Sequence, residues 1–246
     1  MMKNYAVVQH TYSEFLGLIE TQLEKRDIGF SYYRPFVGQG LPGSAGQFDG
    51  LWLLGGAWPT ADQDNNPQVP DELQLIRIFQ KARRPVVGLG MGGLLVAQVA
   101  GGKAAMEPAY TSGFVTARKT SAGAGDALAE ALDGQRVLTL YHGAVALPDG
   151  LEPILVDDEG RWLAVRPDPL TYGLLFRPEM KPGMLEDIIM EQGHNPPPGI
   201  TELLVEARRE WSGMQKITDQ VVMALVTELQ LMQERRKMPV FSLKME

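Results

Sequence analysis

The glycine-rich segment Gly88-Leu89-Gly90-Met91-Gly92-Gly93 has the residue types and spacing that most directly suggest chemistry in this sequence. An apolar run that predicts a strand precedes it, and an apolar run that predicts a helix follows it. Two kinds of site use a glycine-rich turn at that place. Its N–H groups can hold the phosphates of a nucleotide, or the turn can present a nucleophile at its central residue, here Gly90.

The phosphate-binding interpretation lacks part of its expected context. That fingerprint normally opens its domain, whereas three predicted strands precede this one. The acidic residue expected about 20 positions later is not cleanly present; Glu107 comes too early and no strand leads into it. A nucleotide-binding module that uses Gly88 to Gly93 therefore stays as an alternative.

The nucleophile-turn interpretation places Gly90 at the centre of Gly-x-Nuc-x-Gly. The N–H of Met91, together with Gly55-Gly56 after an earlier strand, would then form an oxyanion hole. Glycine has no side chain, so covalent chemistry at Gly90 is impossible. The central residue of such a turn is strained by about 1–3 kcal/mol unless it is glycine. We therefore predict a positive φ at Gly90 with the turn retained.

Alternating strands and helices must position this turn. Apolar runs predict strands at 5–10, 30–33, 48–54 and 85–89, and periodic patterns predict helices at 13–25, capped by Ser13, at 70–82 and at 91–100. This order indicates an α/β fold with a doubly wound, mostly parallel sheet. Ligands bind such sheets at the carboxyl ends of the strands. His10, Gly55-Gly56 and Gly88 to Gly93 should therefore share one neighbourhood. His10 is a candidate for the pocket, although the sequence favours a surface role for it.

The second half predicts shorter strands at 114–118, 136–141, 153–156, 162–165 and 171–176, which we interpret as antiparallel additions to the sheet. Residues 182–192 predict a helix, and three consecutive prolines then break the chain. We predict a domain over residues 1–192, followed by a proline-rich linker and C-terminal helices over 193–246. Helices at 201–211 and 215–237 pack on the domain or form a face for a protein partner or a second copy.

Three ordered blocks carry a family resemblance. They are Asp49-Gly50-Leu51-Trp52-Leu53-Leu54-Gly55-Gly56 with Pro85 to Ala97, then Tyr141-His142-Gly143 with Leu147-Pro148-Asp149-Gly150, and finally Tyr172-Gly173-Leu174-Leu175-Phe176-Arg177-Pro178-Glu179. Over about residues 3 to 192 the chain resembles the class I glutamine amidotransferases, in particular the stand-alone type similar to the glutaminase domain of GMP synthetase. The resemblance implies a flavodoxin-like fold and a Cys–His–Glu triad that releases ammonia from glutamine.

The departures from the family pattern fall on the implied catalytic positions. Gly90 stands where the family has its cysteine, Arg177 stands where it has its histidine, and only Glu179 remains. Leu94 replaces the glutamine-contacting Gln in the helix. Arginine stays protonated and cannot take a proton from a nucleophile. Because Arg177 and Glu179 are two residues apart near a strand end, we expect a salt bridge between them.

The resemblance and the departures together predict a class I glutamine amidotransferase-like protein without glutaminase activity. We expect a binding or regulatory role, with a small-molecule ligand in the degenerate glutamine pocket, and no cofactor. The alternative is an enzyme of different chemistry in the same cleft that uses Glu179, His10 or a bound water. Asp62 and Asp64 follow Gly55-Gly56 and either line this cleft or are solvated. His142 is expected to be structural and His194 solvated.

The composition excludes several classes of function. The 246 residues include no cysteine, which excludes disulfides, thiolate metal sites and a thiol nucleophile anywhere in this sequence. The three histidines lack metal-ligand spacing, so no metal is expected. A net charge of −7 and a pI of about 5.1 do not favour nucleic acid or an anionic membrane as a partner. The sequence shows neither a signal peptide nor a membrane-length apolar run, so we expect a cytoplasmic protein.

Overall fold

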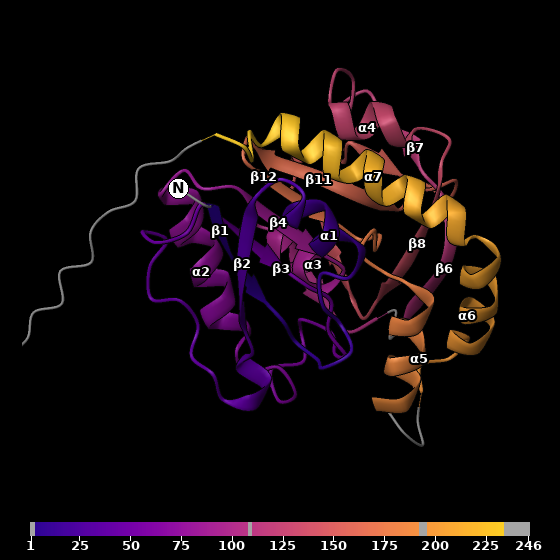
Figure 1. The fold of residues 1–246 in the computed structure, drawn as a ribbon, viewed down its shortest axis with the longest axis horizontal. Coiled ribbons are helices and arrows are strands. Elements are labelled where there is room, and N and C mark those ends of the chain that lie inside the picture. Colours follow the sequence, from indigo (N-terminus) through magenta and orange to yellow (C-terminus); the bar gives the residue numbers. More distant parts are fainter. Residues whose placement is uncertain (1–2, 108–109, 192–195, 234–246) are drawn as a thin grey trace, which may run out of the picture.

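The computed structural model describes residues 3–107, 110–191 and 196–233. A central eight-stranded sheet organises the chain (Figure 1). Its strands lie in the order β2 (Ile28–Tyr33), β1 (Lys3–Val8), β3 (Gly50–Leu53), β4 (Val86–Leu89), β12 (Thr171–Leu174), β11 (Trp162–Asp168), β10 (Leu155–Val156) and β7 (Arg118–Lys119). The first five strands are parallel and the last three antiparallel. The predicted α/β, flavodoxin-like fold with a mostly parallel sheet is confirmed.

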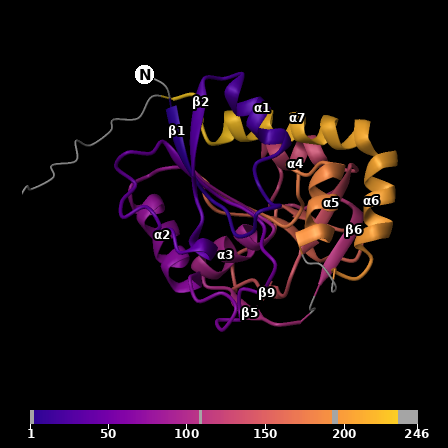
Figure 2. The same cartoon turned by 60° about the horizontal axis from the view of Figure 1, so that its bottom comes forward.

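Helices cover both faces of this sheet (Figure 2). They are α1 (Leu18–Glu24), α2 (Val69–Lys81), α3 (Met91–Val99), α4 (Ala127–Leu132), α5 (Pro182–Glu191), α6 (Ile200–Arg209) and α7 (Trp211–Glu228), with a short 3₁₀ helix at Pro35–Val37. Alternate residues of β1 face opposite sides: Tyr5 and Val7 pack in the cluster that includes α1, α4 and α7, whereas Ala6 and Val8 pack with α2 and α3. Both faces are apolar because both are covered.

The first helix begins later than predicted, at Leu18 rather than at residue 13, and Ser13 does not cap it. Residues before Leu18 run irregularly and turn Glu14 into the protein, where its side chain is buried. The N–H of Ser13 donates to Glu191 instead (2.9 Å), and the N–H of Leu18 donates to the Glu179 carbonyl (2.9 Å). Apolar periodicity alone could not show that the polar residues Ser13 and Glu14 of this stretch are buried.

The later strands only partly extend the main sheet. β10 and β11 add to it in antiparallel orientation as predicted, but β12 pairs parallel with β4, with Leu174 opposite Leu89. β6 (Thr111–Thr116) and β8 (Arg136–Tyr141) form a separate antiparallel pair, as do β5 (Lys103–Ala105) and β9 (Ala144–Ala146). The parallel pairing of β12 matters most, since it brings residues 175–179 to the same edge of the sheet as Gly90.

The C-terminal helices pack on the domain. Val221, Leu225 and Leu229 of α7 and its following turn are buried in one cluster with the sheet, and the Tyr5 hydroxyl donates to the Leu231 carbonyl (2.9 Å). α7 begins at Trp211 rather than at residue 215 and ends at Glu228 rather than at 237: residues 229–233 form turns, and only 234–237 of the predicted helix lie outside the described residues. The predicted boundary after residue 192 falls within 192–195, which are also outside them, and stays a prediction. Within the described ranges, no helix is both long and apolar enough to span a bilayer.

Candidate functional site

The turn at Gly90 has the sharp geometry predicted for it. β4 ends at Leu89 and α3 begins at Met91, and between them Gly90 has φ 55° and ψ −113°. The N–H of Gly90 donates to the Leu174 carbonyl (2.8 Å), which ties the turn to β12. The positive φ is therefore confirmed, and the turn is not remodelled into ordinary helix. A residue with a side chain would be strained in this conformation.

The other glycines of the segment serve close packing. A Cβ on Gly92 would lie 2.2 Å from the Leu53 carbonyl oxygen, and a Cβ on Gly93 would lie 2.4 Å from that of Leu174. Only glycine lets α3 approach the strands this closely. Both residues are buried. The glycine run thus has a packing explanation that needs no phosphate.

The side chain of Arg177 fills the space beside Gly90. A Cβ built on Gly90 would lie 3.0 Å from Arg177 Cδ, 3.3 Å from Arg177 Nη1 and 3.2 Å from the Leu140 carbonyl oxygen. Arg177 reaches this position because β12 runs parallel to β4 and ends beside it. The place where a side chain at position 90 would project is therefore occupied by a cation.

Arg177 is the centre of a buried ion cluster, which we define as Arg177, Glu14 and Glu179. Its Nε donates to Glu179 Oε1 (2.5 Å), and its Nη1 donates to Glu14 Oε1 (2.8 Å) and to the Leu140 carbonyl (3.1 Å). The predicted Arg177–Glu179 salt bridge is confirmed, and Glu14 is a partner that the sequence analysis missed. The Arg177 and Glu179 residues are only 2% and 0% exposed.

Burial and charge act in opposite directions within this ion cluster. Burial lowers the pKa of Arg177, but Glu179 and Glu14 raise it more, so the guanidinium stays protonated. Burial raises the pKa of Glu179 against the opposing effect of Arg177. Glu179 Oε2 and Arg177 Nη2 are buried without a hydrogen-bond partner among the described residues. The ion cluster therefore holds charge in a dry site at a cost in desolvation.

Gly55 and Gly56 lie where the sequence predicted them, beside Gly90, and so does His10. His10 Nδ1 lies 2.8 Å from the Gly55 carbonyl oxygen and its Nε2 lies 3.1 Å from Glu72 Oε1. Burial lowers the pKa of His10, but the charge and hydrogen bond of Glu72 raise it more. Both ring nitrogens face acceptors, an arrangement that favours the protonated imidazolium, which can donate to both. The surface role that the sequence favoured for His10 is wrong, because only 7% of the residue is exposed.

Close contacts fill the rest of the predicted oxyanion hole. A Cβ on Gly55 would lie 2.2 Å from Glu14 Oε1 and 2.3 Å from Arg177 Nη1, and one on Gly56 would lie 2.4 Å from Met91 Sδ. Leu94 is fully buried in an apolar cluster with Tyr141 and Leu175. The predicted site residues are therefore brought together, but their side chains pack against one another.

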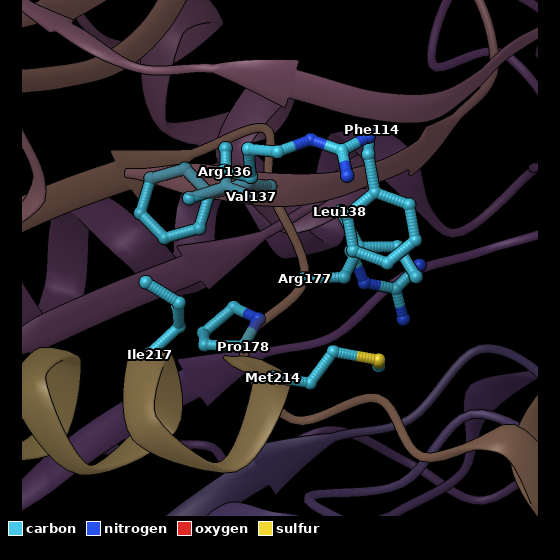
Figure 3. A pocket seen from close by; sticks show the side chains of 9 residues that line it. Phe114, Arg136, Val137, Leu138, Arg177, Pro178, Met214 and Ile217 are labelled. Atoms are coloured by element: carbon cyan, nitrogen blue, oxygen red, sulfur yellow. The ribbon is translucent and has the colours of Figure 1, made fainter. Parts of the chain in front are cut away.

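The void next to Arg177 is small. Behind Arg177 lies a void of only about 10 Å³, between β8 and α7, where Leu138, Met214 and Ile217 surround it (Figure 3). That volume is at the lower limit for one water molecule. Arg177 therefore has no substrate-sized cavity on this side.

An open cleft of about 660 Å³, which we call the outer cleft, lies next to this closed site. Its lining residues are Ala57, Trp58, Pro59, Asp62, Met106, Glu107, Tyr110, His142, Glu191 and Pro196 to Pro198. The two loop acids differ: Asp62 lines the cleft, whereas Asp64 is exposed. His142 lies in the wall with its ring edge-on to Tyr110. His194 lies outside the described residues.

Glu14, Glu72 and Tyr110 are site residues that the sequence pattern did not predict. Glu72 lies in the first turn of α2, where an acidic residue is expected for helix stability alone, yet it is fully buried against His10. The Tyr110 ring lines the outer cleft while its hydroxyl is buried, and burial raises its pKa. Glu14 and Arg177 act on that pKa in opposite directions, which links the cleft wall to the ion cluster. Among the described residues there is no group of three side chains suited to a metal.

This arrangement holds charges, but its residues provide no nucleophile–base pair. Gly90 has no reactive atom, Arg177 has no basic nitrogen to offer, and Glu179 is committed to Arg177. The two ion pairs, at Arg177 and at His10, are enclosed rather than directed at a substrate cavity.

Comparisons with known proteins identify the fold. No protein-family model matches the chain, and no curated protein sequence matches it. Among solved structures, it is similar to a glutamine amidotransferase from Methylobacillus flagellatus, with a TM-score of 0.79 and 23% identity over 94% of this chain and 96% of that one. A glutamine amidotransferase from Thermotoga maritima matches with a TM-score of 0.75 and 19% identity over 92% and 99% of the two chains. A putative GMP synthase subunit from Thermoplasma acidophilum matches with a TM-score of 0.57 and 14% identity over 88% and 98%. The chain thus has the class I glutamine amidotransferase-like fold.

Proposed function

We propose that this chain is a class I glutamine amidotransferase-like protein that does not hydrolyse glutamine and acts through binding, as a regulatory or ligand-carrying protein. The fold supports the likeness to glutamine amidotransferases. The proposed lack of glutamine hydrolysis rests on the correspondence of Gly90, Arg177 and Glu179 with the Cys, His and Glu positions of the family that the sequence resembles.

One observation carries this proposal: the Arg177 side chain lies against Gly90 and is locked there by Glu14 and Glu179. Covalent glutamine hydrolysis needs a nucleophile at the turn and a base that accepts its proton. Here Gly90, at the nucleophile position, has no side chain, and Arg177, at the base position, is a permanent cation. Leu94, packed among apolar side chains, adds no polar contact for an amide substrate.

The glutaminase test compares the wild type with a Gly90→Cys, Arg177→His double variant. The proposal expects no ammonia release from glutamine by the wild type above a no-enzyme control. Gly90→Cys alone should also be inactive, because Arg177 stays next to the new side chain. Activity in the double variant would support the positional assignments, since Glu179 is retained to orient the new histidine. Wild-type turnover would contradict the proposal.

The remaining interpretations have less support. The glycines of Gly88 to Gly93 no longer require a nucleotide to explain them, because close packing of α3 accounts for them. An enzyme of different chemistry would have to use Glu179 or His10, and both are buried in ion pairs. A protein partner or a second copy at the C-terminal helices stays a proposal, for which the exposed Val205 and Met223 offer apolar contacts.

A further inference from the structure

We propose that the outer cleft binds an organic cation with an apolar body, such as an amine, a guanidinium or a quaternary ammonium compound. This inference rests on the proposed binding role of the chain and names the ligand class for it. The volume of about 660 Å³ suits a small molecule. The bound group would lie outside the closed site at Gly90 rather than in it.

Acidic side chains, but no lysine or arginine, are among the lining residues of the outer cleft. Three carboxylates line it, from Asp62, Glu107 and Glu191. They come from separate parts of the fold: the loop after β3, the stretch after β5 and the end of α5. A cleft that is lined by one sign of charge concentrates ligands of the opposite sign.

The carboxylates of Asp62 and Glu191 are held in place by neutral donors. Asp62 accepts hydrogen bonds from the side chain (2.9 Å) and the backbone N–H (3.2 Å) of Asn65. These two hydrogen bonds lower the pKa of Asp62, so it stays ionised. Glu191 accepts from the N–H groups of Tyr12 (3.0 Å) and Ser13 (2.9 Å). Neither carboxylate forms an ion pair within the described part of the chain. Their negative charge is therefore fixed in position and uncompensated.

Aromatic rings also line the outer cleft. Trp58 is 49% exposed, and the rings of Tyr110 and His142 meet edge to face with centroids 4.6 Å apart. The face of an indole or phenol ring attracts a cation, and desolvation in a cleft strengthens this attraction. Pro196 to Pro198 and Met106 add apolar surface. Aromatic faces with acidic neighbours favour a cation that carries hydrocarbon over a bare metal ion or an anion.

The test titrates the full chain with benzyltrimethylammonium by isothermal calorimetry, beside two probes of similar shape, benzyl alcohol and benzoate. The cation should bind, benzoate should not, and benzyl alcohol should bind more weakly than the cation. Raising the salt from about 0.05 M to about 0.5 M should weaken binding of the cation, because screening weakens its attraction to exposed carboxylates.

Two variants locate the ligand. Trp58→Leu should weaken cation binding about five-fold through loss of the indole face. Asp62→Asn should weaken it about three-fold and reduce its salt dependence. Asp64→Asn is the matched control, since this exposed acid lies in the same loop but outside the cleft lining, and it should bind like the wild type. All three side chains are at least partly exposed, so folding should be unaffected.

Three results would overturn the inference: no binding of the cation, equal binding of the cation and benzyl alcohol, or unchanged binding in Trp58→Leu. The glutaminase assay on the same preparation separates the two proposals. Ammonia release by the wild type refutes the proposed lack of catalysis, whereas the titrations decide the cation site whatever that assay shows.

Discussion

Removing the charge of Arg177 should strongly destabilise the protein. In Arg177→Met the side chain keeps much of its volume, but Glu14 and Glu179 lose the buried cation and its hydrogen bonds of 2.8 and 2.5 Å. Breaking a buried ion pair from one side costs about 3–5 kcal/mol. Protonation limits this cost, because giving a buried glutamate a proton at pH 7 takes about 3.7 kcal/mol. We expect a loss of about 4 kcal/mol in the free energy of unfolding at pH 7.

The loss should depend on pH with a definite sign. Burial already raises the pKa of Glu179 in the folded wild type, and without Arg177 it should rise further. A carboxyl group with a raised folded pKa stabilises the fold below its unfolded pKa, and this contribution is lost as the pH rises through the folded pKa. The variant should therefore recover as the pH falls from about 7 to about 5, by up to about 2.7 kcal/mol for one carboxylate.

Urea unfolding followed by circular dichroism at both pH values measures these changes. Arg136→Met is the matched control, because Arg136 also bridges two glutamates, Glu206 (2.6 Å) and Glu210 (2.9 Å), but at an exposed site. It should cost under about 1 kcal/mol at either pH. If Arg177→Met costs no more than this control, or the same at both pH values, the reasoning about the buried ion cluster is refuted.

Two further predictions concern the same neighbourhood. Gly90→Ala should cost about 1–3 kcal/mol in urea unfolding, from the positive φ and the Cβ contact with Arg177, and a loss within experimental error would contradict the turn geometry. His10→Gln should remove a pH-dependent contribution to stability, because the raised pKa of His10 stabilises the fold below about pH 6.5 and this gain is lost as the pH rises through the folded value. Unfolding curves from about pH 6 to about pH 9 should therefore fall less steeply for the variant than for the wild type, and parallel curves would contradict the imidazolium assignment.

The features of the site that follow from local sequence were predictable. The turn at Gly90 follows from a strand, glycines and a helix in succession, and the gathering of His10, Gly55 and Gly90 follows from parallel strands that end at one edge of a sheet. The Arg177–Glu179 pair was predicted from an extended chain, but β12 ends at Leu174 and residues 178–179 form a turn, so the salt bridge forms without the strand geometry assumed for it. Each of these depends on spacing over a few residues or on fold class.

The parts of the site that depend on distant partners were not predictable. Glu14 lies among apolar residues with helical spacing, and its burial makes sense only with Arg177, 163 positions away. Glu72 likewise suits a solvated first helical turn until His10, 62 positions away, is placed beside it. Tyr110 immediately precedes β6, which forms a separate strand pair with β8, and no local pattern specifies the position of this pair relative to the main sheet. A single sequence contains no signal for such tertiary pairings.

The glycine at the turn and the arginine beside it depend on each other physically. A cysteine at position 90 would place its Cβ 3.0 Å from Arg177 Cδ, so Arg177 would have to move. Arg177 would have to give by a few tenths of an ångström while Glu14 and Glu179 hold its buried guanidinium. Restoring the nucleophile alone therefore meets a packed ion cluster rather than an empty catalytic site. The proposed lack of catalysis thus follows from the whole cluster, and a single substitution at Gly90 should not reverse it.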